Sequence, residues 1–218
     1  MNSVGDAFGW AFKDPAWLGK IAVQGLILII PIVGWIATTG WLMLAFENAR
    51  SGRNELPPAG FHLARGIGIF GVFLIYGIVL SIPGFILNGI GSHTVSTSSG
   101  FTYTTGSPLG SFWSLLVQLF IDFLAPTLII MVYHHGFRGG FDLGNIWKYA
   151  TSNVSNSVIG GLVIFAGSII GGLGIIACCI GIFFTIVYSI SIQAAVAAWF
   201  ERQQSAPAAP MAPPTPAA

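Results

Sequence analysis

The chain has 218 residues, of which 54% are hydrophobic and only 7% are charged, against about a quarter charged in typical soluble domains, so an ordinary soluble surface is excluded. A formal net charge of +1, with eight scattered Lys and Arg residues, excludes an extended basic surface for nucleic acid. Three charge-free runs, residues 21–46, 66–121 and 149–200, each exceed the roughly 20 apolar residues that cross a bilayer core. The sequence therefore predicts an all-α polytopic transmembrane helical bundle.

The amino end predicts an amphipathic helix over residues 1–14 that lies in the membrane interface. Ser3 and Asp6 have capping-box spacing. One helical face then gathers five apolar residues, Val4, Ala7, Phe8, Ala11 and Phe12. Acidic residues stand where a signal peptide has its basic region, so no cleavable signal is predicted. Asp14 is expected to end this helix and cap the next one, with Pro15 at the first position.

Residues 17–48 contain a helix breaker, Pro31, followed closely by Gly34. The stretch is therefore either one kinked span or a hairpin with arms at residues 17–31 and 33–48. In the hairpin, every Lys and Arg of the chain falls on one side, which the positive-inside rule makes cytoplasmic. Each arm would be about 22 Å long, short of the roughly 30 Å hydrocarbon core. The sequence favours this short or re-entrant hairpin, with both chain termini cytoplasmic.

Two further spans are predicted at residues 63–90 and 109–134. The loop between them, residues 92–108, contains no Asp, Glu, Lys or Arg. Polar and apolar residues alternate on both sides of Ser99-Gly100, which predicts a small β-hairpin on the non-cytoplasmic side of the membrane.

The carboxyl part predicts a second interfacial amphipathic helix capped by Asp142. Its apolar face comprises Leu143, Ile146, Trp147, Ala150 and Val154. The following run, residues 158–200, would be about 65 Å long as one helix, so it must turn back and form segments 157–173 and 176–200. Residues 205–218 are rich in Pro and Ala and predict a disordered tail. Residues 15–204 then form a membrane domain of about six segments.

Several motifs in the first 60 residues resemble those of one family. They are Ala7-Phe8, Phe12-Lys13-Asp14-Pro15-Ala16-Trp17, Ile29-Ile30-Pro31-Ile32-Val33-Gly34-Trp35, Gly40-Trp41-Leu42 and Glu55-Leu56-Pro57. Together they are similar to the uncharacterised prokaryotic multi-pass membrane family DUF4013. The resemblance implies a protein of a prokaryotic cytoplasmic (inner) membrane. It implies no catalytic residues, because the family has no established activity.

Asp122 is the first candidate for chemistry, since it lies near the middle of the predicted span at residues 109–134, where a charge is costly and usually marks a function. Gln118 lies one turn before it. Asp122 is either an ion- or proton-responsive carboxylate that faces a polar passage, or a protonated acid bonded to a neighbouring helix. The candidate intramembrane polar site comprises Asp122, Gln118, Gln24, Asn88 and Gln193.

His134, His135 and Arg138 cluster at the end of the same span, where they either bind an anion or a metal or contact lipid headgroups. Adjacent histidines point about 100° apart on a helix, so they lack the i, i+4 spacing of a zinc-chelating pair. The headgroup interpretation is favoured, and neither a metal site nor a cofactor site is predicted.

Three further motifs are not interpreted as sites of chemistry: the first is a false match, and the other two are packing features. Residues 66–71 match the dinucleotide-binding fingerprint, but they open an apolar helix with no preceding strand. Gly167 and Gly171 have small-xxx-small spacing, which predicts close helix packing within one chain or between chains. Cys178 and Cys179 have no cation near them in the sequence to activate a thiolate, which indicates small buried apolar groups.

Three classes of function remain. The sparse polar interior favours a non-catalytic membrane scaffold or an accessory or assembly subunit, whose partners are the lipid bilayer and other membrane subunits or further copies of the chain. The alternative is a small transporter or channel, with Asp122 as an intramembrane ion- or proton-responsive group. An enzyme is the least supported class, because the sequence offers no catalytic constellation.

Overall fold

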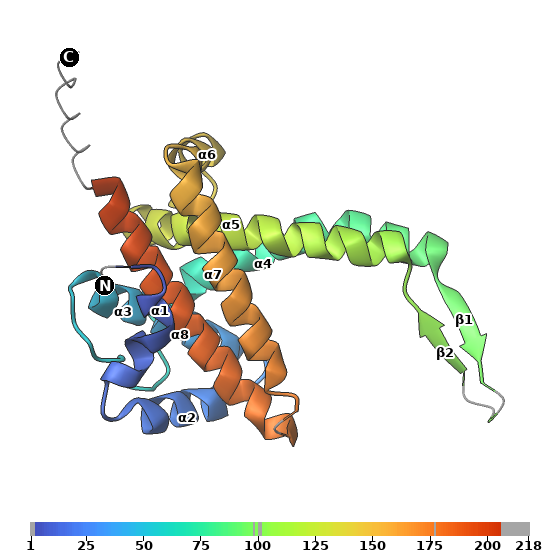
Figure 1. Cartoon of the computed structure of the whole chain (residues 1–218), viewed down its shortest axis with the longest axis horizontal. Helices are drawn as coiled ribbons and strands as arrows, with labels where there is room; N and C mark the ends of the chain where they lie inside the picture. Colours follow the sequence, from blue (N-terminus) through green and yellow to red (C-terminus); the bar gives the residue numbers. More distant parts are fainter. Residues whose placement is uncertain (1–2, 98, 100–101, 177, 206–218) are drawn as a thin grey trace, which may run out of the picture.

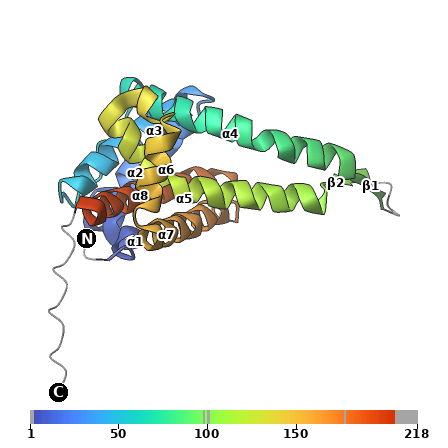
Figure 2. The ribbon, with the colours of Figure 1, turned by 90° about the horizontal axis from the view of Figure 1, so that it is seen from above.

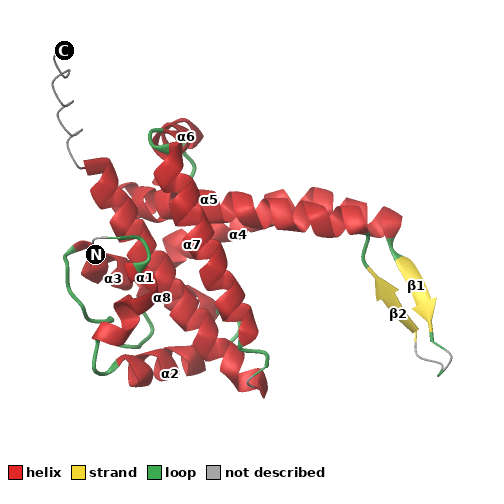
Figure 3. Ribbon diagram, viewed as in Figure 1, coloured by secondary structure: helices red, strands yellow, loops and turns green. Residues whose placement is uncertain are grey.

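The computed structural model describes residues 3–97, 99, 102–176 and 178–205. The described part is all-α except for one small β-hairpin (Figure 1, Figure 3). Its elements in chain order are α1 (Asp6–Trp10), the 3-10 helix η1 (Ala11–Lys13), α2 (Trp17–Leu28), α3 (Val33–Arg50), α4 (Leu63–Gly91), β1 (His93–Ser96), β2 (Thr102–Thr105), α5 (Pro108–Gly139), α6 (Leu143–Thr151), α7 (Val154–Leu173) and α8 (Cys178–Ser205). The predicted all-α class is confirmed. Of the predicted tail at residues 205–218, all but the first residue lies outside the described residues.

Among the described residues, four helices are long and apolar enough to cross a membrane: α4, α5, α7 and the part Gly181–Ser205 of α8. The four predicted spans after residue 60 correspond to them. By contrast, α2 has 12 residues, or about 18 Å of helix, well short of the roughly 30 Å bilayer core. The predicted count of about six segments is therefore not confirmed. The structure has four membrane-length helices and, at residues 17–50, a shorter pair.

This shorter pair, α2 and α3, forms a hairpin and not one kinked span. In the turn, the Val33 amide donates to the Pro31 carbonyl at 2.6 Å. Ile32, between them, has φ = 63°, a left-handed conformation that is strained for a β-branched residue. The chain reverses so fully that Lys20 of α2 donates to the carbonyl of Leu56, which follows α3.

The long helices α4 and α5 pack against each other and form an arm that extends beyond the rest of the molecule (Figure 1, Figure 2). The hairpin β1–β2 lies at the far end of this arm. Its strands pair antiparallel, with His93 opposite Thr105 and Val95 opposite Tyr103. The β-hairpin predicted from alternation around Ser99-Gly100 is confirmed.

Helix α8 is the centre of the fold, because it contacts α1, α2, α3, α5 and α7. Its carboxyl-terminal half contains a run of small side chains with no exposed surface, Ala194, Ala195, Val196, Ala197 and Ala198. Small side chains let neighbouring helices approach closely, which matters in a bilayer because van der Waals packing drives helix association there.

Glycines on α7 bring that helix against α8. A Cβ atom built on Gly171 would lie 3.4 Å from the Cβ of Ser189, and one on Gly167 would lie 3.4 Å from Ile192. The Thr185 hydroxyl also donates to the Gly171 carbonyl at 2.7 Å. The close packing predicted for Gly167 and Gly171 therefore occurs within the chain, between α7 and α8.

The amino-terminal helix is shorter than predicted. Only α1 and η1 are helical within residues 3–14, and their buried residues Ala7 and Trp10 pack against α8 and the loop after α3. The predicted role of Asp14 as a helix N-cap is wrong, since α2 begins at Trp17 with Ala16 as its N-cap. The Asp14 carboxylate accepts from Ala16, Lys20 and the distant Leu56, as described below.

Candidate functional site

Several basic residues take part in contacts that join α1, α2, the ends of α3 and α8, the start of α4 and the loop after α3. Hydrogen bonds and ion pairs join these segments: Trp10 to the Arg53 carbonyl, Lys20 to the Leu56 carbonyl, Arg65 to Glu47, Arg50 to Glu201, and Arg202 to the Ala49 carbonyl. We call this region the charged end. The prediction that every Lys and Arg lies on one, cytoplasmic side of a membrane stays a prediction.

Asp14 ties the start of α2 to the loop between α3 and α4. Its carboxylate accepts from the Lys20 ammonium at 2.7 Å, from the Leu56 amide at 2.8 Å and from the Ala16 amide at 2.8 Å, and the residue is only 2% exposed. Desolvation by burial acts to raise the pKa of Asp14, but the Lys20 hydrogen bond and the two amides outweigh it, so the pKa lies below its usual value. Asp14 is therefore a buried, ionised anchor.

Gln24 belongs to the same region and not to a site around Asp122. Its side-chain amide donates to the Thr38 hydroxyl at 3.2 Å, and its carbonyl oxygen accepts from the Gly60 amide at 3.0 Å. The residue is fully buried. Trp41 adds a bond from its indole to the Pro57 carbonyl at 3.2 Å. These polar groups hold the α3–α4 loop against the hairpin.

A second junction at the charged end is built around Glu201 of α8. Its carboxylate lies 2.6 Å from Arg50 Nε at the end of α3 and 2.7 Å from His134 Nε2 near the end of α5. The Arg50 guanidinium also lies over the Tyr133 ring, 5.5 Å from its centroid. Glu201 is 8% exposed, so a nearly buried carboxylate joins three helices. Sequence reasoning missed this role, although a charged residue directly after a long apolar run was a usable signal.

Asp122 is buried within α5, with 4% of its surface exposed. Both of its carboxylate oxygens accept from the Gln118 side-chain amide at 3.0 Å, one turn earlier on the same helix. Helix α7 covers this turn, since a Cβ on Gly161 would lie 3.0 Å from Phe123. The structure thus brings Gln118 and Asp122 together as predicted.

The remaining predicted polar residues are dispersed. Asn88 and Gln118 line one cavity of about 270 Å³ between α4 and α5, and the Asn88 carbonyl oxygen accepts from the Ser107 amide at 3.1 Å. Gln193 is half-buried on α8. Asn88 and Gln118 therefore share a cavity between α4 and α5 that neither Asp122 nor Gln24 lines.

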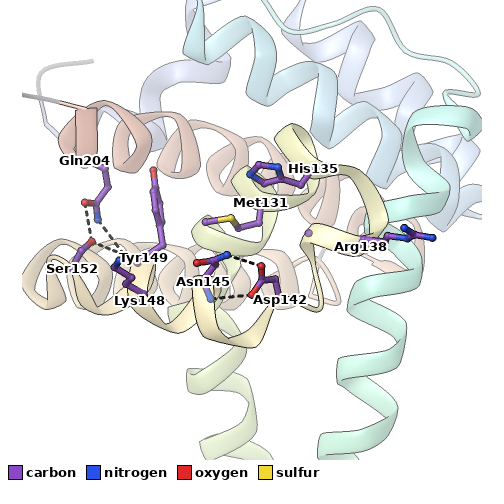
Figure 4. A pocket seen from close by; sticks show the side chains of 10 residues that line it. Met131, His135, Arg138, Asp142, Asn145, Lys148, Tyr149, Ser152 and Gln204 are labelled. Carbon is purple, nitrogen blue, oxygen red and sulfur yellow. Dashed lines mark hydrogen bonds between the residues drawn. The ribbon is translucent and has the colours of Figure 1, made fainter.

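A larger pocket, of about 670 Å³, lies at the charged end between α5, α6 and α8 (Figure 4). Met131 and His135 come from α5, Asn145 and Tyr149 from α6, and Gln204 from α8. Helix α6 begins where predicted, because Asp142 Oδ1 accepts from the Asn145 amide at 3.2 Å. Burial is the main cause that raises the pKa of Tyr149, and the nearby Glu201 carboxylate raises it further. The Tyr149 hydroxyl is therefore neutral near pH 7.

Comparison with known proteins yields one family. The family model described as "Protein of unknown function (DUF4013)" matches residues 23–183, well over half of the chain. The chain belongs to the DUF4013 family. Comparisons with curated proteins and with solved structures found no match. The DUF4013 match includes the α3–α4 loop, Asp122 and α6, whereas Asp14 and Glu201 lie outside it.

Four of the five motifs that resemble DUF4013 lie in the α2–α3 hairpin or next to it in the chain. Residues 12–17 and 55–57 meet through the bonds of Asp14 and Lys20 to Leu56, and the 40–42 motif reaches Pro57 through Trp41. The 29–35 motif forms the turn between α2 and α3. These DUF4013-like motifs therefore shape the hairpin and its loop.

Proposed function

We propose that this membrane protein is a non-catalytic scaffold or accessory subunit that assembles with other membrane proteins through its helices. The outward surface of α4 carries the proposal. In the most apolar stretch of α4, only 17% of the residues are buried inside the chain, compared with 50% in α5. Six apolar side chains in its second half are more than half exposed: Ile78, Val79, Ile82, Phe85, Ile86 and Ile90.

The use of the polar side chains supports the same function. Asp14, Gln24 and Glu201 are buried, and each bonds to parts of this chain that are distant in sequence. A protein that conducts or binds a polar solute needs polar groups that remain available along a path. Here these groups stabilise the arrangement of helices, which suits a rigid subunit.

The charged end supports an orientation in a prokaryotic cytoplasmic membrane. If this end faces the cytoplasm, the positive-inside rule is satisfied for the Lys and Arg residues of the charged end, and both termini are cytoplasmic. The β-hairpin at the far end of the α4–α5 arm then lies on the opposite side.

Purification from native membranes tests the proposed function. The full chain, tagged at its carboxyl end and extracted in a mild detergent, is expected to retain one or more membrane proteins in fixed stoichiometry. Replacing Phe85, which is 76% exposed, by Ser is expected to weaken that retention, whereas Leu18→Ser on α2, at 63% exposure, is the matched control. A chain that is isolated without partners under these conditions contradicts the proposal.

A small transporter or channel is the second candidate, and the buried Asp122, which accepts from the exposed Gln118, favours it. Proteoliposomes that contain only this chain would then carry ion or proton flux, and Asp122→Asn would abolish it while the protein remains folded. We expect no flux above that of empty liposomes, so measurable flux sensitive to Asp122→Asn would replace the scaffold proposal.

A further inference from the structure

The pocket between α5, α6 and α8 has unpaired positive charge at both ends. Figure 4 shows Lys148 beside Ser152 and Gln204 at one end and, at the other, Arg138, whose side chain extends away from the rest of the lining. Within the described ranges, the side chains of Lys148 and Arg138 make no hydrogen bond or ion pair. In contrast, Lys20, Arg50 and Arg65 each have a carboxylate partner. The pocket thus holds cations that no acid of the described chain neutralises.

The one acidic residue in the pocket lining is already engaged. Asp142 Oδ1 accepts from the Asn145 backbone amide at 3.2 Å, and Oδ2 accepts from the Asn145 side chain at 2.6 Å. These bonds cap α6 and hold the carboxylate beside its own helix. These neutral amide donors leave the carboxylate charge in place, but the lining contains two cationic side chains, Lys148 and Arg138, against this one carboxylate, so its net positive charge favours an anionic ligand.

The opposite side of α6 covers a second cavity, of about 600 Å³, whose lining is almost entirely apolar. Leu80 and Phe120, from the membrane-length helices α4 and α5, form its floor, and Leu143 and Trp147 of α6 contribute the outer wall. Leu143 is 65% exposed and Trp147 is 55% exposed. An exposed Trp beside a polar face is typical of a helix in the membrane interface.

Together these two cavities match the two parts of one molecule. We propose that the chain binds an anionic phospholipid at α6, with its phosphate group in the pocket at Lys148 and an acyl chain in the apolar cavity under Trp147. A soluble phosphate compound would use only the first cavity, whereas a lipid of the adjacent leaflet uses both. This inference is independent of the proposed assembly role.

Native mass spectrometry of the purified full chain provides the test. The protein is titrated with phosphatidylglycerol and, separately, with phosphatidylcholine of the same acyl chains. We expect preferential retention of phosphatidylglycerol, and a loss of affinity of roughly tenfold for Lys148→Gln, the size expected for one charge-assisted contact. Arg138→Gln is expected to cause a smaller loss, because the Arg138 side chain extends away from the rest of the lining. Lys148→Arg is expected to retain most of the binding.

Lys13→Gln is the matched control, because Lys13 is also exposed at the charged end and its side chain has no partner among the described residues. An equal loss of binding in Lys13→Gln would show general attraction to the protein surface and would overturn the proposal. Inorganic phosphate in large excess distinguishes the sources of the ligand. Displacement of the lipid by phosphate alone, or equal retention of the two lipids, would also overturn it.

Discussion

Replacing Asp14 by Asn tests whether the charged end holds the hairpin in place. The substitution keeps the size of the side chain but removes its charge. Lys20 and the Leu56 amide both donate to Oδ2 of Asp14 and the Ala16 amide donates to Oδ1, so the single oxygen of Asn cannot accept from all three. Removing one partner of a buried ion pair costs about 3–5 kcal/mol. The Lys20 side chain is 25% exposed and regains some hydration, so we expect a loss of about 2–4 kcal/mol in the free energy of unfolding.

Glu47→Gln is the matched control for this substitution. Glu47 and Arg65 are as close as Asp14 and Lys20, at 2.6 Å, but their side chains are 34% and 55% exposed. Exposed ion pairs contribute about 0–1 kcal/mol. Unfolding of both variants in detergent micelles, followed by tryptophan fluorescence, measures the difference. Equal losses in the two variants, or no loss in Asp14→Asn, would refute the assignment of Asp14 as a buried anchor.

The pH dependence of the same comparison follows from the lowered pKa of Asp14. A carboxylate whose pKa is lower in the folded state contributes stability above its unfolded pKa, about 4, and loses it as the pH falls through the folded value. The stability difference between the wild-type chain and Asp14→Asn is therefore expected to be constant near neutral pH and to shrink below about pH 4.

Three further substitutions probe other parts of the fold, each by the midpoint of thermal unfolding in detergent. Gly66→Ala places a methyl group against the backbone of α3 near Ile36 and is expected to cost about 1–3 kcal/mol; an unchanged midpoint would show that α3 and α4 are not so close. Ile32→Gly relieves the left-handed conformation at the hairpin turn and is expected to stabilise by about 1 kcal/mol, whereas a destabilised variant would contradict that turn. Glu201→Gln deprives Arg50 and His134 of their carboxylate and is expected to cost about 2–4 kcal/mol, and a neutral effect would remove Glu201 from the junction.

Local signals in the sequence predicted the elements that depend on neighbouring residues. Alternation around Ser99-Gly100 sufficed for the β-hairpin, because strand pairing there joins residues close in sequence. Asp142 was recognised as a cap because its partner is three residues away. The membrane-length helices followed from apolar runs alone.

Contacts between distant residues limited the prediction of the candidate site. Gln24 is a polar residue in an apolar helix, and composition alone cannot distinguish a membrane-centre site from a bond to Gly60, 36 residues later. Asp14 has a good local interpretation as a cap, which the tertiary bond to Leu56 overrides. The pocket beside α6 joins residues from α5, α6 and α8, so no local pattern predicts it.

Site-specific photo-crosslinking in native membranes tests the proposed assembly role most directly. A photoreactive amino acid replaces Ile78 on the outward surface of α4, which is 55% exposed, or Val72 on the buried surface, which is fully covered. We predict a discrete crosslinked polypeptide from position 78 and only crosslinks within the chain from position 72. Lipid adducts alone at position 78 would contradict the proposal that α4 is an assembly surface.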